Sequence, residues 1–506
     1  MASLQTLIPA LSQSAVFLLI FYGLFVLVSV TLFLLYHQRH DWPLANDVAP
    51  SENWPAVTLQ IPIYNERRVA ARVVRAVANL DYPADKLQIQ VLDDSTDSTS
   101  TVLSRLVAEL RRERNLNIQY MHRKKRHGYK AGALADALAQ ATGEFIGIFD
   151  ADFAPDSDWL KRAIAAMTPH PNLAFLQTRW EHMNRSQNII TAAQALALDG
   201  HFVVEQQARS ASGFMQNFNG SGGLWRRAAI DDAGGWQADT VTEDLDLAYR
   251  AQLAGWRGGY VNNIEAPAEL PPVITGFKRQ QRRWAKGSIQ TLRKLALPVL
   301  RSDKSWGKKL YAIAHMGGYA FHLPLLAMLL FTLPLALLPA YHPPLSFIGG
   351  VSMIFSAAPF VMFALAQYAL AGRSGLKRLW ALPILAILFM GLSPAISASV
   401  ISGLRHSGGV FERTPKQGRG PRRSALPSQM ALRDFTPEFL AFAYALLALA
   451  AIAITRRWGL APLPGLFLLG SGLTLTLELQ EYRAVRRTHR PRRASRLARP
   501  GDIRTG

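Results

Sequence analysis

The chain has 506 residues, 49% of them hydrophobic, with a formal net charge of +21 and no cysteine. This length has room for a catalytic domain of about 250 residues and a membrane part. The lack of cysteine excludes disulfides, zinc–thiolate sites and a cysteine nucleophile. Lysine and arginine gather beside apolar segments, as on the cytoplasmic flanks of transmembrane helices. We therefore interpret the charge as a membrane feature and expect no nucleic-acid partner.

An apolar segment near the start of the chain predicts a membrane anchor. Residues 15–36 form an uncharged run of 22 residues, long enough to cross a bilayer core of about 30 Å. No basic region precedes the run, and it is too long for a typical signal peptide, so we expect an uncleaved anchor. His37, Arg39 and His40 follow it and place the next domain in the cytoplasm.

The next part of the chain alternates between strand and helix patterns. Such alternation predicts an open, mostly parallel α/β sheet, in which ligands bind outside the carboxyl ends of the strands. The predicted strands are 57–61, 89–92, 118–121 and 145–149, and the predicted helices are 67–80, 98–112 and 130–141.

Apolar runs return after residue 309. The run 380–404 is interrupted by Pro383, Gly391 and Pro394. If it crossed the membrane, the basic loop 406–435 would lie outside, against the positive-inside rule. We therefore expect this run to be re-entrant or interfacial, which leaves five full spans, with six as the alternative. The full spans are residues 15–36, 312–340, 346–371, 439–455 and 460–479.

Asp150 and Asp152 follow the predicted strand 145–149. Side chains two residues apart on a strand point the same way, so both carboxylates can face one site. Paired carboxylate oxygens suit Mg²⁺ or Mn²⁺ bound together with a diphosphate. A capped turn is the alternative interpretation.

A second acidic strand end and a lysine extend this predicted site. Asp93 and Asp94 follow strand 89–92, where one carboxylate could accept the ring N–H of a nucleotide base. The alternative for this acidic segment is a cap of the next helix, for which Asp97 is the candidate. Lys130 lies at a helix start, where a cation beside free N–H groups can hold phosphate. For residues 123–126 we favour a solvated basic loop.

Asp244 is the candidate general base, because sugar transfer to a hydroxyl group needs a carboxylate near the acceptor oxygen. The surrounding sequence also predicts the start of a helix, with Thr242 as cap and Glu243 in the first turn. A position in this first turn and a role as general base can coexist. The glycine-rich segment 218–223 would allow close backbone approach to a ligand.

The joint between the soluble part and the membrane runs carries Gln280, Arg283 and Trp284. Arg283 would offset the negative charge of a departing diphosphate. Trp284, with Trp225, could stack on a sugar ring. The alternative is an amphipathic helix on the membrane surface, rich in lysine and arginine. We assign that surface role to Lys278, Arg279, Arg293 and Lys294.

Seven segments in this order resemble those of the family 2 membrane glycosyltransferases. The similarity covers residues 55–294 and is greatest to the plant cellulose-synthase-like mannan and glucan synthases and their bacterial relatives. The segments are Gln-Ile-Pro-Ile-Tyr-Asn-Glu (60–66), Val-Leu-Asp-Asp-Ser-Thr-Asp (91–97), Gly-Tyr-Lys-Ala-Gly-Ala-Leu (128–134), Phe-Asp-Ala-Asp-Phe (149–153), Phe-Asn-Gly-Ser-Gly-Gly (218–223), Thr-Glu-Asp-Leu-Asp-Leu (242–247) and Gln-Gln-Arg-Arg-Trp (280–284).

The resemblance implies an α/β GT-A (Rossmann-like) cytoplasmic glycosyltransferase domain inserted between transmembrane α-helices. It also implies an inverting, metal-dependent transfer from a nucleotide sugar and export of the polymer through the enzyme's own channel. In the implied site, Asp94 holds the base with Asp93, Tyr64 and Glu66 nearby. Asp150 and Asp152 bind metal-diphosphate, Lys130 contacts phosphate, Asp244 is the base, and Gln280, Arg283 and Trp284 line the acceptor and leaving-group site.

Residues 411–416 resemble the gating loop of cellulose synthases through Phe411, Thr414 and Lys416, whereas Arg413 and Pro415 depart from that pattern. A loop of this kind is expected on the cytoplasmic side. The tail after residue 479 is too short for the cyclic-di-GMP-binding domain of bacterial cellulose synthases, so we expect no direct activation by that messenger through this chain.

These patterns predict a processive inverting glycosyltransferase. It would polymerise a β-glycan, either β-1,4-mannan/glucomannan or β-glucan, from GDP-mannose or UDP-glucose with Mg²⁺ or Mn²⁺, and export it. The main alternative adds one sugar from UDP-glucose to a diacylglycerol or ceramide-like acceptor, and a non-catalytic membrane scaffold is another.

The expected partners are a nucleotide sugar, the growing glycan and membrane lipids, with the catalytic domain on the cytoplasmic side of the plasma (bacterial inner) membrane. The expected divisions are an anchor (1–40), a GT-A domain (41–309), a transmembrane channel region (310–480) with a gating-like loop (405–435), and a basic tail (481–506).

Overall fold

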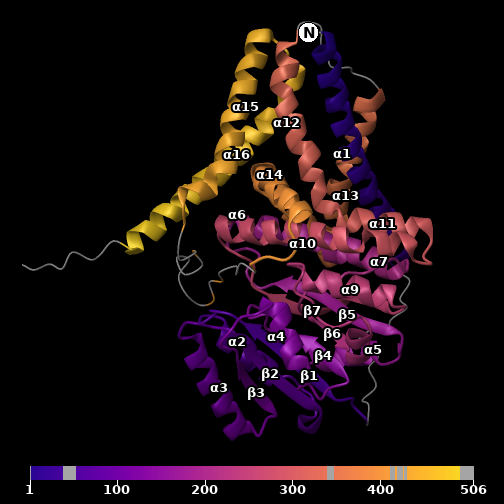
Figure 1. Cartoon of the computed structure of the whole chain (residues 1–506), viewed down its shortest axis with the longest axis vertical. Coiled ribbons are helices and arrows are strands. Elements are labelled where there is room, and N and C mark those ends of the chain that lie inside the picture. The colour runs from indigo at the N-terminus through magenta and orange to yellow at the C-terminus, as the bar shows by residue number, and fades with distance from the viewer. Residues whose placement is uncertain are drawn as a thin grey trace, which may run out of the picture.

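The computed structural model describes residues 2–37, 53–338, 347–410, 416, 418, 426 and 430–489. Figure 1 shows an α/β part built on one sheet, a group of long helices on one side of it, and a set of helices lying between the two. We call this set the interface layer. Its members are α6 (Ile189–Asp199), α7 (Gln207–Ala211), α10 (Ile274–Arg301) and α11 (Trp306–Met316).

The sheet has seven strands in the order β3-β2-β1-β4-β6-β5-β7. Every neighbouring pair is parallel except those that β6 makes, because β6 runs antiparallel to both β4 and β5. The predicted mostly parallel α/β sheet is confirmed, although β5, β6 and β7 were not predicted. The strands are β1 (Val57–Ile63), β2 (Leu87–Asp93), β3 (Ile118–His122), β4 (Phe145–Ile148), β5 (Leu173–His182), β6 (Gly223–Arg226) and β7 (Arg257–Ala268).

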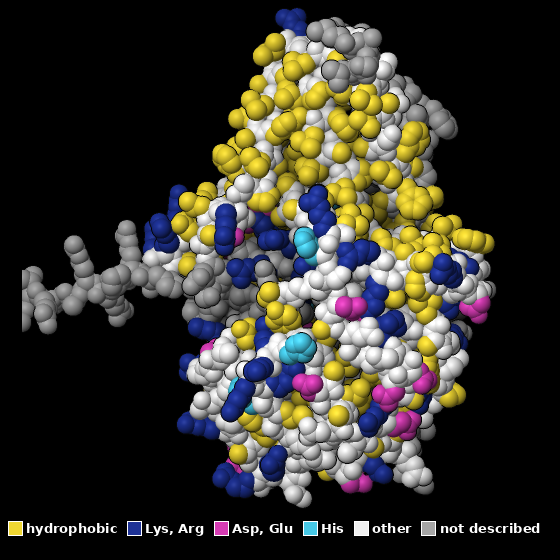
Figure 2. All heavy atoms as spheres, viewed as in Figure 1, with side chains coloured by type: hydrophobic (Ala, Val, Ile, Leu, Met, Phe, Trp, Pro, Cys, Tyr) yellow, Lys and Arg dark blue, Asp and Glu magenta, His cyan; other side chains and the backbone are white. Residues whose placement is uncertain are grey.

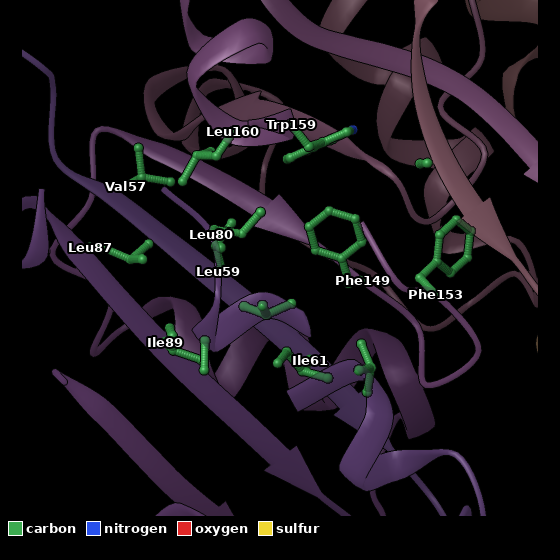
Figure 3. Packing of buried hydrophobic residues seen from close by; sticks show 14 of the residues in the cluster. Val57, Leu59, Ile61, Leu80, Leu87, Ile89, Phe149, Phe153, Trp159 and Leu160 are labelled. Carbon is green, nitrogen blue, oxygen red and sulfur yellow. The ribbon is translucent and has the colours of Figure 1, made fainter. Parts of the chain in front are cut away.

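Helices cover both faces of the sheet, so the strands are buried on both sides. Alternate residues of β1, such as Leu59 and Ile61, pack in the cluster shown in Figure 3, where the Phe149 and Trp159 rings meet edge-on at 4.7 Å. The helices that share this cluster are α2 (Ala70–Ala78), α3 (Thr99–Arg114) and α5 (Trp159–Met167). A second cluster holds α4 (Tyr129–Leu138), α8 (Arg227–Asp232) and α9 (Glu243–Leu253).

The central strands also bury polar side chains, and these are hydrogen-bonded to one another. Thr58 donates to Gln88 Oε1 over 2.7 Å, and Gln60 Nε2 donates to Gln90 Oε1 over 2.9 Å. Because a buried polar group without a partner is costly, each such pair favours one register of β1 against β2.

The carboxyl ends of β1, β2, β4 and β5 lie at one edge of the sheet, because these strands run in the same direction. Strand β6 runs the other way and therefore starts at this edge. The segments after four strands and the segment before β6 consequently converge on one place, below the interface layer (Figure 1).

The described residues contain five helical segments long and apolar enough to cross a membrane. Figure 2 shows a broad yellow surface on the part of the molecule away from the sheet. Large apolar side chains of these segments, such as Leu18, Phe21 and Leu447, are exposed, as expected of a surface that meets lipid. The segments are Gln5–Tyr36, Gly318–Leu337, Ala357–Arg405, Leu432–Thr455 and Pro462–Arg487.

The segment Ala357–Arg405 combines most of α13 (Phe347–Gly375), which is kinked at Ala371 and Gly372, with α14 (Leu382–Arg405). The short turn before α14, η5 (Leu376–Ala381), contacts α6, and the last turn of α14 meets α10, where Arg293 donates to the Leu404 carbonyl. Both ends of α14 therefore lie against the interface layer. Whether α14 crosses the membrane or is re-entrant, and thus whether there are five or six crossings, stays a prediction.

Helix α10 is fixed to the membrane helices at its first turn. Glu481 of α16 (Pro462–His489) accepts hydrogen bonds from the backbone N–H groups of Ile274 and Thr275, which serves as a cap supplied from another helix. One turn on, the Lys278 ammonium lies 2.7 Å from Glu438 of α15 (Thr436–Thr455) and 2.9 Å from Glu478 of α16.

Most of helix α10 is thus packed inside the protein, and the predicted membrane-surface role is wrong for Lys278 and Lys294, whereas Arg293 is exposed and its role stays a prediction. Lys278 is buried in the acidic cluster just described. Lys294 pairs with Asp239 and Asp246, and Arg293 bonds to α14 carbonyls. The sequence pattern showed a basic face but gave no sign of the distant carboxylates that meet it.

Removing the Lys278 charge should destabilise the protein strongly. Lys278→Met would leave Glu438 and Glu478 buried without their cation, which typically costs about 3–5 kcal/mol. The thermal unfolding midpoint in detergent should fall by several degrees. Lys161→Met is the matched control, since it breaks only an exposed pair with Asp81, worth about 0–1 kcal/mol. Equal midpoints for the two variants would contradict this account of the cluster.

Candidate active site

A cavity of about 130 Å³ lies at the carboxyl edge of the sheet, below α10. We call it the donor cavity. Its walls come from the segments that follow β1, β2 and β4, from Trp180 near the carboxyl end of β5, from the segment before β6, and from α4, α9 and α10. Most of the predicted site residues line it, namely Tyr64, Glu66, Asp94, Lys130, Asp150, Asp152, Asp244, Gln280, Arg283, Trp284 and Lys416.

The two aspartates after β4 each meet a lysine. Lys130 Nζ lies 2.6 Å from Asp150 Oδ1 and donates to the Gly220 carbonyl over 2.8 Å. Lys416 Nζ lies 2.6 Å from Asp152 Oδ2. Burial opposes the charge of Lys130, but the carboxylates of Asp150 and Glu243 more than offset this effect and raise its pKa. The cavity therefore holds an alternating set of fixed positive and negative charges.

Lys416 comes from a segment far along the chain, and Glu269 holds that segment in place. Lys416 Nζ donates to the Glu269 carbonyl over 3.0 Å, and the Gly418 N–H donates to the Glu269 carboxylate, also over 3.0 Å. Arg72 pairs with the same carboxylate at 3.0 Å. Lys416 therefore lies in the site, while Phe411 and Thr414, the other two predicted gating residues, are outside the described residues.

A second part of the cavity forms around Asp94. Arg123 binds both of its carboxylate oxygens, at 2.8 and 2.7 Å. Arg126 stacks its guanidinium 3.5 Å above the Tyr64 ring, and burial lowers its pKa. The predicted solvated loop at 123–126 is thus wrong for Arg123 and Arg126. In the sequence these two arginines look like the other basic residues of the segment, and only the fold distinguishes them. The stacked guanidinium and ring offer a flat, polar surface that suits a nucleotide base.

The predicted contact of Asp93 with the nucleotide is not supported by its position, because Asp93 is fully buried behind the cavity wall. It accepts hydrogen bonds from Ser95 N–H at 2.9 Å and from Tyr120 Oη at 2.6 Å. Burial opposes ionisation of Asp93, but these bonds outweigh it and lower the pKa. Alternation along β2 explains the error, because neighbouring residues point to opposite sides and only Asp94 reaches the cavity.

Asp244 lies in the first turn of α9, and its backbone neighbour Leu245 donates an N–H to it over 2.8 Å. Burial and the negative charge of Glu243 raise the pKa of Asp244 to about 7, although Lys130 acts in the opposite direction. A carboxylate that titrates near neutral pH is suited to accept a proton from a hydroxyl group.

A second cavity, of about 290 Å³, opens on the other side of Asp244. We call it the acceptor cavity. Its walls come from α6, α9 and α10 and from residues of the membrane helices, including Tyr22 of α1 (Ala2–Tyr36) and Phe389 of α14. The N-terminal helix therefore contributes to a cavity as well as crossing the apolar layer. Six residues line both cavities, namely Trp180, Asn219, Thr242, Asp244, Gln280 and Trp284.

Trp225, predicted to stack on a sugar, does not reach either cavity. It lies on β6 with its side chain fully buried against Phe175, Phe218 and Trp236. Trp180, near the carboxyl end of β5, lines both cavities where Trp225 was expected to line the sugar site. Its indole N–H donates to the Ser221 carbonyl over 3.0 Å. The apolar run 173–176 before it could have identified β5, and thus Trp180 as a residue near a strand end.

Helix α10 can bring Gln280, Arg283 and Trp284 to this junction because of Gly287, which lies two turns after Gln280. A Cβ atom at Gly287 would overlap the Thr242 side chain, the residue before α9. The absence of a side chain lets α10 lie directly against the start of the helix that carries Asp244. This contact sets the distance between the two halves of the site.

The described part of the chain contains no cluster of three or more histidine and carboxylate side chains placed to hold a metal ion by themselves. Asp150 and Asp152 nevertheless offer hard oxygen donors at one wall of the cavity, each now facing a lysine ammonium. A divalent cation would need further oxygens, such as those of a diphosphate.

Together these features define a class of protein. A Rossmann-like sheet with an Asp-x-Asp pair at a strand end, a base-sized stacking surface and a buried carboxylate between two cavities is the arrangement of a GT-A glycosyltransferase. Residues 55–287 match the family model described as glycosyltransferase like family 2. Residues 55–287 therefore form a family 2 glycosyltransferase domain.

Curated relatives agree with this assignment, and a solved structure shares the fold. Glucomannan 4-beta-mannosyltransferase 2 of Arabidopsis thaliana is 41% identical over 267 residues, covering 52% of this chain and 50% of the relative. Glucomannan 4-beta-mannosyltransferase 1 of Oryza sativa subsp. japonica is 38% identical over 284 residues, covering 53% and 54%. The chain thus spans about half the length of the curated relatives it matches.

The solved structure is the mannosyltransferase PcManGT from Pyrobaculum calidifontis, in complex with GDP-Man and Mn²⁺. It is 22% identical, with a TM-score of 0.50, covering 74% of this chain and 97% of that one. At this identity the likeness supports the fold alone.

Gly220 should be essential for the position of Asp244. It has φ of +83°, and a Cβ atom there would lie 2.5 Å from Asp244 Oδ2. Gly220→Ala should lower kcat about 100-fold, because displacing a catalytic group by about 1 Å has an effect of this size. Gly235→Ala is the control, since Gly235 has φ of +69° with no atom near its added Cβ. Both variants share the backbone strain, so a similar loss of kcat in both would contradict the steric explanation.

Proposed function

We propose that the protein is a processive, inverting glycosyltransferase that extends a β-1,4-mannan or glucomannan with mannose from GDP-mannose. The observation that carries this proposal is the position of Asp244, at the junction of a charged donor cavity and an aromatic-lined acceptor cavity. The names of the relatives support mannose as the sugar, and UDP-glucose is the alternative donor.

On the donor side, Asp150 and Asp152 would hold Mg²⁺ or Mn²⁺ together with the diphosphate, with Lys130 and Arg283 beside it. Bound there, the cation would neutralise part of the diphosphate charge. The base would lie by Tyr64, Asp94 and Arg126. Lys416 would exchange its bond with Asp152 for contact with the bound donor, which is the role we assign to the loop that carries it.

In the transfer step, Asp244 accepts the proton of an acceptor hydroxyl group as the oxygen attacks the anomeric carbon. The bond between that carbon and the diphosphate oxygen breaks, and the new glycosidic bond forms on the opposite face of the sugar. The nucleoside diphosphate leaves with the bonding electron pair, and Lys130 and Arg283 stabilise its added charge. Trp180 and Trp284, which line both cavities, would hold the acceptor ring between donor and base.

The acceptor cavity leads from Asp244 towards α1 and α14, and we propose that the growing chain passes this way across the membrane. The catalytic domain would face the cytoplasm of a plasma or bacterial inner membrane. Phenylalanine and tyrosine side chains in the cavity offer sugar rings flat apolar surfaces without anchoring any one ring. Such contacts allow a polymer to move by one unit after each addition.

A donor panel tests this function. The purified protein in lipid with Mg²⁺ or Mn²⁺ should incorporate mannose from GDP-[¹⁴C]mannose into a polymer that a β-mannanase degrades. Label that extracts into organic solvent instead would identify a lipid glycosyltransferase and contradict the polymer. Incorporation from UDP-glucose alone would replace mannan by glucan while keeping the mechanism.

The role of Asp244 predicts a pH dependence with a definite sign. Because the base acts only when deprotonated, kcat/KM should fall tenfold per unit as the pH drops below about 7 and level off above it. Asp244→Asn should lower transfer by about 10²–10⁴-fold and leave binding of GDP unchanged.

Glu243→Gln provides the companion measurement. It removes the negative charge beside Asp244, and the pKa of Asp244 should fall, moving the acid limb of the profile to lower pH. Unchanged turnover in Asp244→Asn, or an acid limb that moves to higher pH in Glu243→Gln, would remove Asp244 from this role.

A further inference from the structure

One wall of the acceptor cavity is a π-helical turn, η3 (Gly200–Gln206), between α6 and α7. Turns of this kind are rare and occur often at functional sites. His201 and Glu205 project from it into the cavity, and His201 Nδ1 lies 3.1 Å from Glu205 Oε2. The proposed chemistry uses neither residue.

The direction of the hydrogen bonds behind this wall is fixed by Arg209, whose side chain is fully buried. A guanidinium only donates, so Gln206 Oε1 must accept its hydrogen bond of 3.1 Å. Gln206 Nε2 then donates to Asn219 Oδ1 over 2.6 Å, and Asn219 Nδ2 donates to His201 Nε2 over 3.1 Å. His201 is consequently neutral, with its remaining proton on Nδ1, and it donates to Glu205.

Glu205 therefore ends the chain as a hydrogen-bond acceptor. Burial opposes its charge, whereas the charge of Arg209 and the hydrogen bond from His201 act to lower the pKa of Glu205. The other carboxylate oxygen, Oε1, lies 3.7 Å from Arg209 Nη2 and 3.8 Å from His315 Nε2. Both distances exceed hydrogen-bond length, so Oε1 can accept a further hydrogen bond from a ligand in the cavity.

His315 is fixed in the same way. Its Nε2 accepts from Arg209 Nη1 over 2.7 Å, so its proton is on Nδ1, which faces Tyr249 Oη at 2.8 Å. It therefore presents no proton to Glu205. Glu205 Oε1 can therefore accept a hydrogen bond from a molecule in the cavity.

We propose that Glu205, oriented by His201, binds a hydroxyl group of the acceptor sugar unit that follows the reacting one. This inference rests on the proposed function. Glu205 lines the acceptor cavity but not the donor cavity, so it lies beyond the tryptophans at which the reacting unit would stack. Neutral sugar hydroxyls can donate to a carboxylate, whereas a uronic acid or a phosphate group would be repelled by it. The geometry thus points to specificity for an uncharged glycan.

The test combines a variant with altered acceptors. β-1,4-Mannobiose and analogues that each lack one hydroxyl group on the second ring are supplied to the full-length protein in lipid with GDP-mannose. With the wild-type chain, one analogue should lose about tenfold or more in kcat/KM, the size of a lost hydrogen bond to a charged group. With Glu205→Gln, mannobiose itself should lose about tenfold, and the penalty of that analogue should shrink, which is the signature of a direct interaction.

Donor hydrolysis without acceptor serves as the internal control, and Glu205→Gln should leave it unchanged. Glu181→Gln is the matched charge control, since Glu181 lines neither cavity, and it should retain the wild-type pattern. Equal penalties in wild type and Glu205→Gln would overturn the proposal. If Glu205→Gln fails to fold, the wild-type series still decides, since the absence of any hydroxyl-dependent loss on that ring overturns it too. A chain that extends no oligosaccharide but glycosylates lipid would refute the proposed function instead.

Discussion

The structure depends on how α10 is held. This helix carries Gln280, Arg283 and Trp284, and it is fixed at three levels. Its first turn is capped by Glu481, its second is paired through Lys278 with Glu438 and Glu478, and its middle lies against Thr242 at Gly287. The first two contacts come from membrane helices and the third from the catalytic domain. Because charges buried in pairs are costly to separate, α10 transmits the position of one part to the other as a rigid element.

In the donor cavity, too, positive and negative side chains are paired. Two carboxylates after β4 face two lysines, one from the domain itself and one from a segment more than 250 residues further along the chain. Each lysine ammonium lies against a carboxylate that could instead bind a divalent cation. Binding of a diphosphate with its cation would therefore exchange partners within a set of charges already ordered, without bringing unpaired charges into the site. Such preorganisation lowers the reorganisation needed when charge moves to the leaving group.

Local sequence patterns predicted the first half of the sheet and most of the site. Strands β1 to β4 are separated by short helices, so their periodicity is visible, and Asp94, Asp150 and Asp152 follow from their positions at strand ends. What failed depends on distant partners. Trp225 was misplaced because β6 runs antiparallel and turns it into the core, and Trp180 was missed with β5. Lys278 read as a surface cation because its two glutamates lie 160 and 200 residues away in sequence.

Besides the residues that line both cavities, a chain of hydrogen bonds that starts at Arg209 connects them. Arg209 sets the orientation of Gln206, Gln206 sets that of Asn219, and Asn219 lines both cavities next to Gly220, the residue in contact range of Asp244. A buried guanidinium cannot reverse its role, so this chain has a single arrangement of donors and acceptors. The same side chain therefore leaves Glu205 as an acceptor in one cavity and is linked to the segment beside Asp244 in the other. The proposed acceptor contact at Glu205 and the proposed base, Asp244, thus belong to one network, which would place recognition of the chain and activation of its hydroxyl group under a common constraint.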